Sequence, residues 1–160
     1  MTHSKTQFLS HKLLLASVLL FNVLSHQALA YEIGDSIDND LATELNLPAD
    51  KVTLIDFFAS WCKSCAKEIP GIKQIYQQGT VNVIGIDVDD ELEDGLVLQK
   101  KLEIDFPVIN DTEQKIISKF SPIGMPAMYY IKNNKIIGKH IGAIDNIEQV
   151  IQQDMIAFEE

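Results

Sequence analysis

The pattern of hydrophobic and polar positions predicts alternating strands and helices in the first half of the main domain. Residues 51 to 59 form a nearly continuous apolar run of strand length, which is typical of a central strand covered on both faces. Residues 63 to 78 carry apolar side chains at steps of three and four, which predicts an amphipathic helix. A second buried strand over 81 to 88 and a helix over 92 to 102 follow. This order indicates a βαβ unit and an α/β fold.

The middle of the chain continues with a short extended segment and another helix. Residues 106 to 109 are predicted to be extended, and Asp111 is placed to cap a helix over 112 to 120. The helix over 92 to 102 is expected to turn four leucines inward: Leu92, Leu96, Leu98 and Leu102.

The last third of the pattern predicts a hairpin and a final helix. Strands over 127 to 131 and 135 to 141 flank a tight turn at Asn133-Asn134. The final helix runs from about residue 146 to 158 and turns an apolar stripe to the core. No strong element is expected in the polar segment from 31 to 50.

Residues 1 to 30 have the layout of a secretory signal peptide. Lys5 and Lys12 lie in a stretch without acids, an apolar run from Leu13 to Leu24 follows, and Ala28-Leu29-Ala30 matches a cleavage site. A run of about 12 apolar residues is shorter than the roughly 20 of a spanning helix. We therefore predict a cleaved signal peptide over 1–30 and a periplasmic domain over 31–160, in preference to an uncleaved membrane anchor.

The predicted mature domain is strongly acidic. Without Lys5 and Lys12 it has 11 basic and 23 acidic residues, a formal charge of −12. Such a surface is a poor partner for nucleic acid. It favours basic partners such as apo-cytochromes or cationic unfolded segments, unless the acidity only keeps the protein soluble.

The two cysteines carry the main chemical signal. Cys62 and Cys65 are separated by two residues, and closing so small a loop contributes little to stability. Exported proteins usually use cysteines as staples across longer loops. The spacing therefore favours redox chemistry or metal binding over a structural disulfide.

The residue inventory disfavours a metal or haem site. Zinc needs about four ligands drawn mainly from Cys and His. Outside residues 1–30, the sequence offers only Cys62, Cys65 and His140. Ala66 stands where a c-type haem motif requires His. The acidic run from Asp87 to Asp94 has Leu92 where a calcium loop requires Gly, so we interpret it as a solvated loop. No cofactor beyond the Cys62–Cys65 pair is expected.

These residues together resemble the thioredoxin superfamily and, within it, the exported TlpA/ResA/DsbE-like reductases. The resemblance is carried by the segment from Asp56 to Cys65, by Glu68 and Pro70, and by Gly124-Met125-Pro126. It covers roughly residues 50 to 157. It implies a thioredoxin fold with a central mixed sheet flanked by helices and an inserted strand-helix segment in the middle.

The expected mechanism starts from Cys62, which lies just ahead of a helix. The amide groups and the dipole of a helix N-terminus favour a thiolate there. Cys62 is then the nucleophile that attacks a substrate disulfide, and Cys65 resolves the mixed disulfide. Lys63 either adds a positive charge near the sulfur or points into water.

Two acids are candidates for proton transfer. Asp56 lies inside an apolar strand, where burial raises the pKa of a carboxyl group. The resemblance implies that Asp56 assists deprotonation of the resolving cysteine, and that Glu68 matches an acid of the exported relatives. A surface or capping role is the alternative for either acid.

Three further residues are expected near the substrate. The resemblance implies a cis Met125–Pro126 peptide bond facing Cys62, which exposes backbone for pairing with an extended substrate. An ordinary trans proline before a strand is the alternative. Trp61 is expected to shield the dithiol, unless it only fills the core.

The resemblance, and the absence of His between the cysteines, favour a reductase of selected exported proteins, such as apo-cytochrome c or a copper-site thiol pair. A membrane thiol relay is implied as the electron donor, and we expect a monomer. A disulfide oxidase or isomerase, or a non-enzymatic thioredoxin-fold binding module, is the alternative.

Overall fold

The computed structural model describes residues 30–159. Its centre is a five-stranded sheet in the order β3-β2-β1-β4-β5. Strand β1 pairs in parallel with β2, β2 pairs in parallel with β3, and β4 is antiparallel to both β1 and β5. The strands are β1 (Thr53–Phe58), β2 (Asn82–Asp87), β3 (Val108–Asn110), β4 (Ala127–Lys132) and β5 (Lys135–Ile141). The predicted signal peptide lies outside the described residues, except for Ala30.

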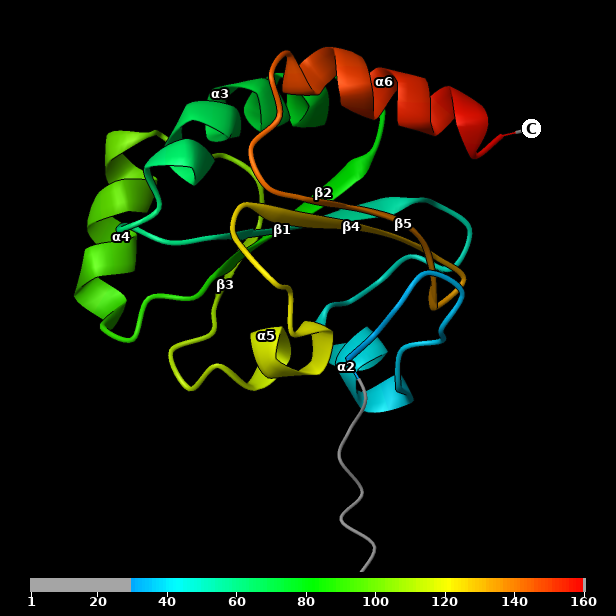
Figure 1. Ribbon diagram of the computed structural model, residues 1–160, viewed down its shortest axis with the longest axis horizontal. Helices are drawn as coiled ribbons and strands as arrows, with labels where there is room; N and C mark the ends of the chain where they lie inside the picture. The colour runs from blue at the N-terminus through cyan, green and yellow to red at the C-terminus, as the bar shows by residue number, and fades with distance from the viewer. Residues whose placement is uncertain (1–29, 160) are drawn as a thin grey trace, which may run out of the picture.

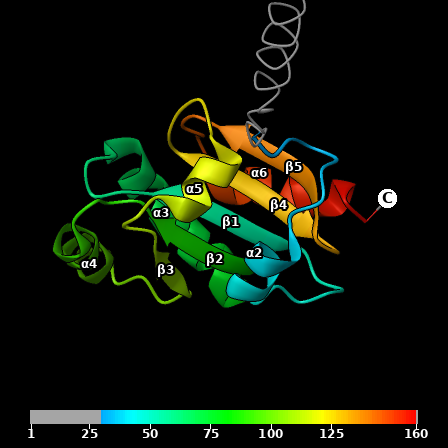
Figure 2. The same cartoon turned by 90° about the horizontal axis from the view of Figure 1, so that it is seen from below.

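Helices cover both faces of this sheet (Figures 1 and 2). α3 (Lys63–Gln78) and α6 (Ile147–Ala157) lie on one face, and α2 (Asn39–Glu44) and α5 (Lys115–Phe120) lie on the other. α4 (Leu92–Lys101) stands at one end of the molecule, and with β3 it forms the segment between β2 and α5. This arrangement confirms the predicted fold class of a mixed sheet flanked by helices.

The central strand explains the nearly continuous apolar run in the sequence. All six residues of β1 are buried, because the strand has a neighbour on each side and helices on each face. Phe57 packs edge-on against Phe120 of α5, with ring centroids 5.1 Å apart. Since successive side chains of a strand point to opposite faces, Asp56 faces the layer that contains α3.

The short helix α2 was not predicted from the sequence. Asp38 caps it by accepting a hydrogen bond from the Leu41 backbone N–H at 2.8 Å, and Leu41 and Leu45 are buried. Six helical residues are too few to show a clear hydrophobic period. The only features of the sequence that could have predicted this helix were the capping residue Asp38 and the two leucines.

The orientation predicted for the helix over 92 to 102 is wrong at two of its leucines. Leu98 is buried, but Leu92 and Leu96 are 48% and 42% exposed. The helix instead approaches the sheet through Gly95, where a Cβ would overlap the Asp87 carboxylate. This close approach at Gly95 rotates Leu92 and Leu96 away from the core.

The remaining elements lie close to their predicted positions. Asp111 caps α5 by accepting hydrogen bonds from the backbone N–H groups of residues 115, 116 and 117, so the helix begins later than residue 112. Asn133 and Asn134 both have left-handed φ values, as a tight two-residue hairpin turn requires. Ile147 and Ile151 bury the inner face of α6.

Candidate active site

Cys62 and Cys65 form a disulfide at the beginning of α3, with their Cα atoms 5.3 Å apart. Cys62 is the N-cap residue, and its sulfur accepts a hydrogen bond from the Cys65 backbone N–H at 3.2 Å. The Ser64 hydroxyl lies 3.6 Å from the same sulfur. Cys65 is 2% exposed and Cys62 is 5% exposed, so Cys65 is the more deeply buried of the two. The helix N-terminus therefore places one backbone N–H and one hydroxyl beside the Cys62 sulfur, and such groups would stabilise a thiolate in the reduced protein.

The turn before Cys62 is attached to the loop that follows β2. Ser60 donates two hydrogen bonds of 2.7 Å to Asp89, one from its backbone N–H and one from its hydroxyl. The Asp89 backbone N–H donates in turn to Asp87, which also accepts from the side chain of Gln99 in α4. Burial, together with the neighbouring Asp89, raises the pKa of Asp87.

These contacts correct the interpretation of residues 87 to 94 as a solvated acidic loop. Asp87 and Asp89 are buried, while the acids from Asp90 to Asp94 are exposed. Asp89, Ser60 and Ser64 were not among the site residues predicted from the sequence. One signal was available for Asp89, because it directly follows a strand that we expected beside the strand leading to Cys62.

Asp56 is completely enclosed in the central strand, between Gly85 of β2 and Met128 of β4. Burial, and secondly the charge of Glu68, raise its pKa well above that of an ordinary aspartate. A surface role is therefore excluded. The carboxyl group lies on the side of the sheet covered by α3, the helix that carries Cys65.

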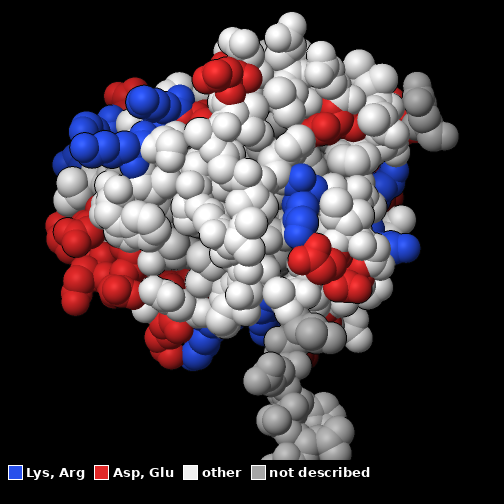
Figure 3. Space-filling model, in the orientation of Figure 1, with Lys and Arg blue, Asp and Glu red and all other residues white. Residues whose placement is uncertain are grey.

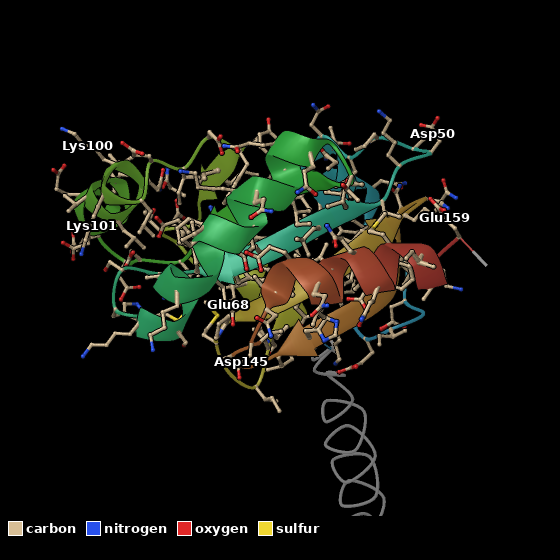
Figure 4. The ribbon with its side chains drawn as sticks, turned by 90° about the horizontal axis from the view of Figure 1, so that it is seen from above. Asp50, Glu68, Lys100, Lys101, Asp145 and Glu159 are labelled. Carbon is tan, nitrogen blue, oxygen red and sulfur yellow. A yellow bond between two sulfur atoms is a disulfide. The ribbon has the colours of Figure 1, made fainter. Side chains whose placement is uncertain are left out.

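Glu68 is also buried, on the first half of α3. One oxygen accepts a hydrogen bond of 2.6 Å from the Ile144 backbone N–H, and the other is buried without a partner among the described residues. Burial raises the pKa of Glu68, and the Ile144 hydrogen bond opposes this effect. Figure 4 shows Glu68 at the boundary between α3 and the start of α6, near Asp145. Glu68 thus connects the cysteine helix to the loop before α6.

The predicted substrate-contacting residues lie in two turns. The Met125–Pro126 peptide bond is cis, as the resemblance implied, and the Pro126 carbonyl accepts a hydrogen bond from Gly142. Pro126 is buried and Met125 is half-buried. Trp61 is 64% exposed, which excludes the alternative that it fills the core. Lys63 is exposed on the first turn of α3.

Residues 30–159 contain no group of three or more His, Cys, Asp and Glu side chains arranged to hold a metal ion. His140 contacts Asp154 of α6 at 2.7 Å instead. In the same residues, no helix has the length and apolar character needed to cross a membrane.

Comparison with known proteins agrees with this geometry. Residues 26–141 match the model of the AhpC/TSA family. The thiol-disulfide oxidoreductase ResA of Bacillus cereus is 31% identical over 69% of this chain and 70% of its own length. The thiol:disulfide interchange protein CycY of Rhizobium leguminosarum is 28% identical over 79% of this chain and 69% of its own.

The fold recurs in solved structures. One from Chlorobium tepidum, described as a thiol:disulfide interchange protein DsbE, superimposes with a TM-score of 0.68 at 20% identity, covering 80% of this chain and 98% of that one. Together with the cysteine pair at the start of α3, these matches place the chain in the thioredoxin superfamily. The chain belongs to the AhpC/TSA family and is a thioredoxin-like thiol-disulfide oxidoreductase similar to ResA and CycY.

Proposed function

We propose that this chain is exported to the periplasm and reduces disulfide bonds of selected exported proteins there, with apo-cytochrome c among them. One observation carries the proposal: the more exposed cysteine, Cys62, caps α3, and the more buried Cys65 lies one turn further along. This order suits attack by Cys62 followed by resolution by Cys65.

The reaction balances as a two-electron exchange. The Cys62 thiolate attacks one sulfur of the substrate disulfide, forms a mixed disulfide and releases the other substrate sulfur as a thiolate. The Cys65 thiolate then attacks the Cys62 sulfur, which restores the Cys62–Cys65 disulfide and releases the second substrate thiolate. Two electrons have passed to the substrate, and two protons complete its thiols.

Asp56 and Glu68 would serve the proton steps of this reaction. Cys65 must lose a proton before it attacks, and Asp56 lies beneath α3 as a carboxyl group with a raised pKa. An acid whose pKa approaches that of the medium is a better proton carrier than an exposed aspartate. Glu68 acts on Asp56 through its charge, and it reaches the surface loop at Ile144.

The substrate and the electron source are inferred from charge and resemblance. The formal charge of −10 over the whole chain favours basic partners, and apo-cytochrome c is one such class. Renewed reduction of the Cys62–Cys65 disulfide would come from a membrane thiol relay. No other cofactor is needed for the exchange, and the domain would act as a monomer.

Trapping of mixed disulfides tests the proposal. A Cys65→Ala variant should accumulate covalent adducts with exported proteins in the cell, because Cys62 can attack but nothing resolves the product. The adducts should disappear on reduction and in a Cys62→Ala/Cys65→Ala variant. Absence of any adduct would count against disulfide exchange and in favour of a binding module with a structural disulfide.

The direction of electron flow needs a second measurement. A reductase should have a midpoint potential at or below the range of glutaredoxins, about −200 mV. A potential well above that value would reverse the assignment and make the protein an oxidase or isomerase. Insulin reduction by the wild-type protein provides an independent check of reductive activity.

A further inference from the structure

Exposed apolar side chains gather at the end of the molecule that carries the disulfide. Of the large apolar residues that are strongly exposed within residues 30–159, two lie in the turns that precede Cys62 and Met125, and three lie on α4. These five are Trp61, Ile123, Leu92, Leu96 and Val97. Two others, Ile33 and Ile156, lie elsewhere. Isolated exposed apolar residues need no explanation, but a cluster beside a reactive group marks an interaction surface.

α4 adjoins the active-site turn. The helix begins three residues after Asp89, whose side chain holds Ser60, the residue before Trp61. Figures 1, 2 and 4 show α4 and the beginning of α3 at the same end of the molecule. A polypeptide whose disulfide reaches Cys62 would therefore pass close to α4.

The start of α4 is strongly negative. Asp90, Glu91, Glu93 and Asp94 are all exposed, and none of them forms an ion pair within the described part of the chain. Figure 3 shows this acidic cluster at the edge of the molecule where Figure 1 places the first turn of α4. The lysines of the helix, Lys100 and Lys101, lie at its other end (Figure 4). The start of α3 carries two exposed lysines, Lys63 and Lys67, against the four exposed acids at the start of α4.

We propose that Trp61 and the exposed face of α4 form a docking surface for a cationic, leucine-rich or similarly apolar segment of an unfolded polypeptide substrate. The α4 face consists of Leu92, Leu96 and Val97 together with Glu91, Glu93 and Asp94. The proposal rests on the proposed function, because it names the kind of substrate that the dithiol receives.

The chemistry of the face selects this occupant. Its apolar side chains are 42% to 57% exposed and would gain by burial against apolar residues of a partner. Its unpaired carboxylates attract lysine or arginine and repel acidic segments.

Synthetic peptides test the proposal directly. Three peptides of equal length carry one internal disulfide, flanked by Lys and Leu, by Glu and Leu, or by Lys and Ser. Reduced protein should reduce the Lys/Leu peptide with a second-order rate constant about tenfold higher than that for the Glu/Leu peptide at low salt. The preference should fall steeply at about 0.5 M salt, because exposed charges are then screened. The Lys/Ser peptide should lie between the two.

Matched variants locate the surface. Glu91→Gln/Glu93→Gln should lower the ratio of Lys/Leu peptide reduction to that of bis(2-hydroxyethyl) disulfide, a small neutral reference, by about fivefold. Asp50→Asn/Glu159→Gln removes the same charge at the opposite end of the molecule (Figure 4) and should leave the ratio unchanged. Leu96→Gln/Val97→Gln should also lower the ratio, whereas Ile156→Gln, a single substitution at a more exposed apolar residue on α6, should not.

The outcomes separate the two proposals. Equal rates for the three peptides, or equal losses in test and control variants, would overturn the docking surface and leave the reductase intact. Failure to reduce any disulfide, including the small reference, would overturn the proposed function and the docking surface with it.

Discussion

Asp89 accepts both hydrogen bonds that Ser60 can donate, from its backbone N–H and from its hydroxyl, each at 2.7 Å. The two residues are 29 positions apart in the sequence and meet because β1 and β2 are parallel neighbours that end at the same edge of the sheet. The loop after β2 therefore fixes the turn that leads into Cys62. Tight positioning of a nucleophile matters because small displacements of reacting groups are costly in rate.

Replacement of Asp89 by Ala should destabilise the oxidised protein by about 2 kcal/mol, since hydrogen bonds to a charged group contribute more than neutral ones. Asp89→Asn retains one acceptor and should lose less. Urea unfolding measures both changes. In the reduced protein, alkylation of Cys62 should show a changed rate in the Ala variant and partial recovery in the Asn variant. If Asp89→Ala matches the wild type in both urea unfolding and Cys62 alkylation, the turn before Cys62 keeps its conformation without the Asp89 hydrogen bonds.

The sequence predicted those parts of the site that are local in the chain. Cys62 and Cys65 stand together, and Asp56 was recognisable because it is a carboxylate within an apolar run. The bounds of α3 followed from its apolar period and from Gly79, which ends the helix with a left-handed backbone. The proton-transfer roles of Asp56 and Glu68 remain predictions.

The parts that were missed depend on contacts between distant segments. Asp89 binds Ser60 across 29 residues, and Glu68 binds Ile144 across 76. Neither partner stands out by residue type. The orientation predicted for α4 was wrong for a related reason. The leucine spacing predicts an apolar stripe, but it does not show that the helix packs closely against Asp87 at Gly95. Periodicity identifies the faces of a helix, but it does not determine which of them packs against the rest of the protein.

Asp56 should make the stability of the fold fall as the pH rises. Its folded pKa is raised above that of the unfolded chain, so the folded state holds a proton that the unfolded state releases above about pH 4. Stability is therefore fully present below that pH and is lost as the pH rises toward the folded pKa. Asp56→Asn removes this loss.

We expect Asp56→Asn to match the wild type near pH 4 and to become increasingly more stable than it at higher pH, because a buried carboxylate no longer has to be ionised or held protonated. Urea unfolding of the oxidised proteins across that range measures the difference. A wild-type advantage that grows with pH would contradict the buried, raised-pKa state. The same variant should reduce disulfides more slowly if Asp56 carries the proton of Cys65.

Glu68→Gln should move the pH profile of disulfide reduction to lower pH. The charge of Glu68 raises the pKa of Asp56, so its removal lets Asp56 ionise and act as a base at lower pH. Gln keeps an oxygen that can accept from the Ile144 N–H, which limits structural change. The rate of insulin reduction measured across pH gives the profile.

Asp145→Asn is the matched control for Glu68→Gln, because Asp145 lies in the same loop as Ile144 but is exposed to solvent. Its profile should coincide with that of the wild type. If Glu68→Gln also leaves the pH profile of disulfide reduction unchanged, the two buried acids do not interact during turnover. Any proton transfer by Asp56 would then not depend on Glu68.

Gly95→Ala should destabilise the protein by about 1–3 kcal/mol, the usual cost of overpacking, even though Ala is favoured over Gly in a helix by about 1 kcal/mol. The new methyl group would overlap the Asp87 carboxylate, which holds both Gln99 and the Asp89 backbone. Leu96→Ala, on the exposed side of the same helix, should change the free energy of unfolding by less than about 0.5 kcal/mol.

Because Asp89 also holds Ser60, displacement of Asp87 in Gly95→Ala should be transmitted to the turn before Cys62. Alkylation of Cys62 in the reduced variant should then deviate from wild type in the same direction as in Asp89→Ala. A destabilised Gly95→Ala protein with an unaltered alkylation rate would mean that α4 stabilises the fold without positioning the nucleophile. A Gly95→Ala protein that is more stable than the wild type would show that Asp87 moves aside at little cost. The close approach at Gly95 would then not explain why Leu92 and Leu96 are exposed.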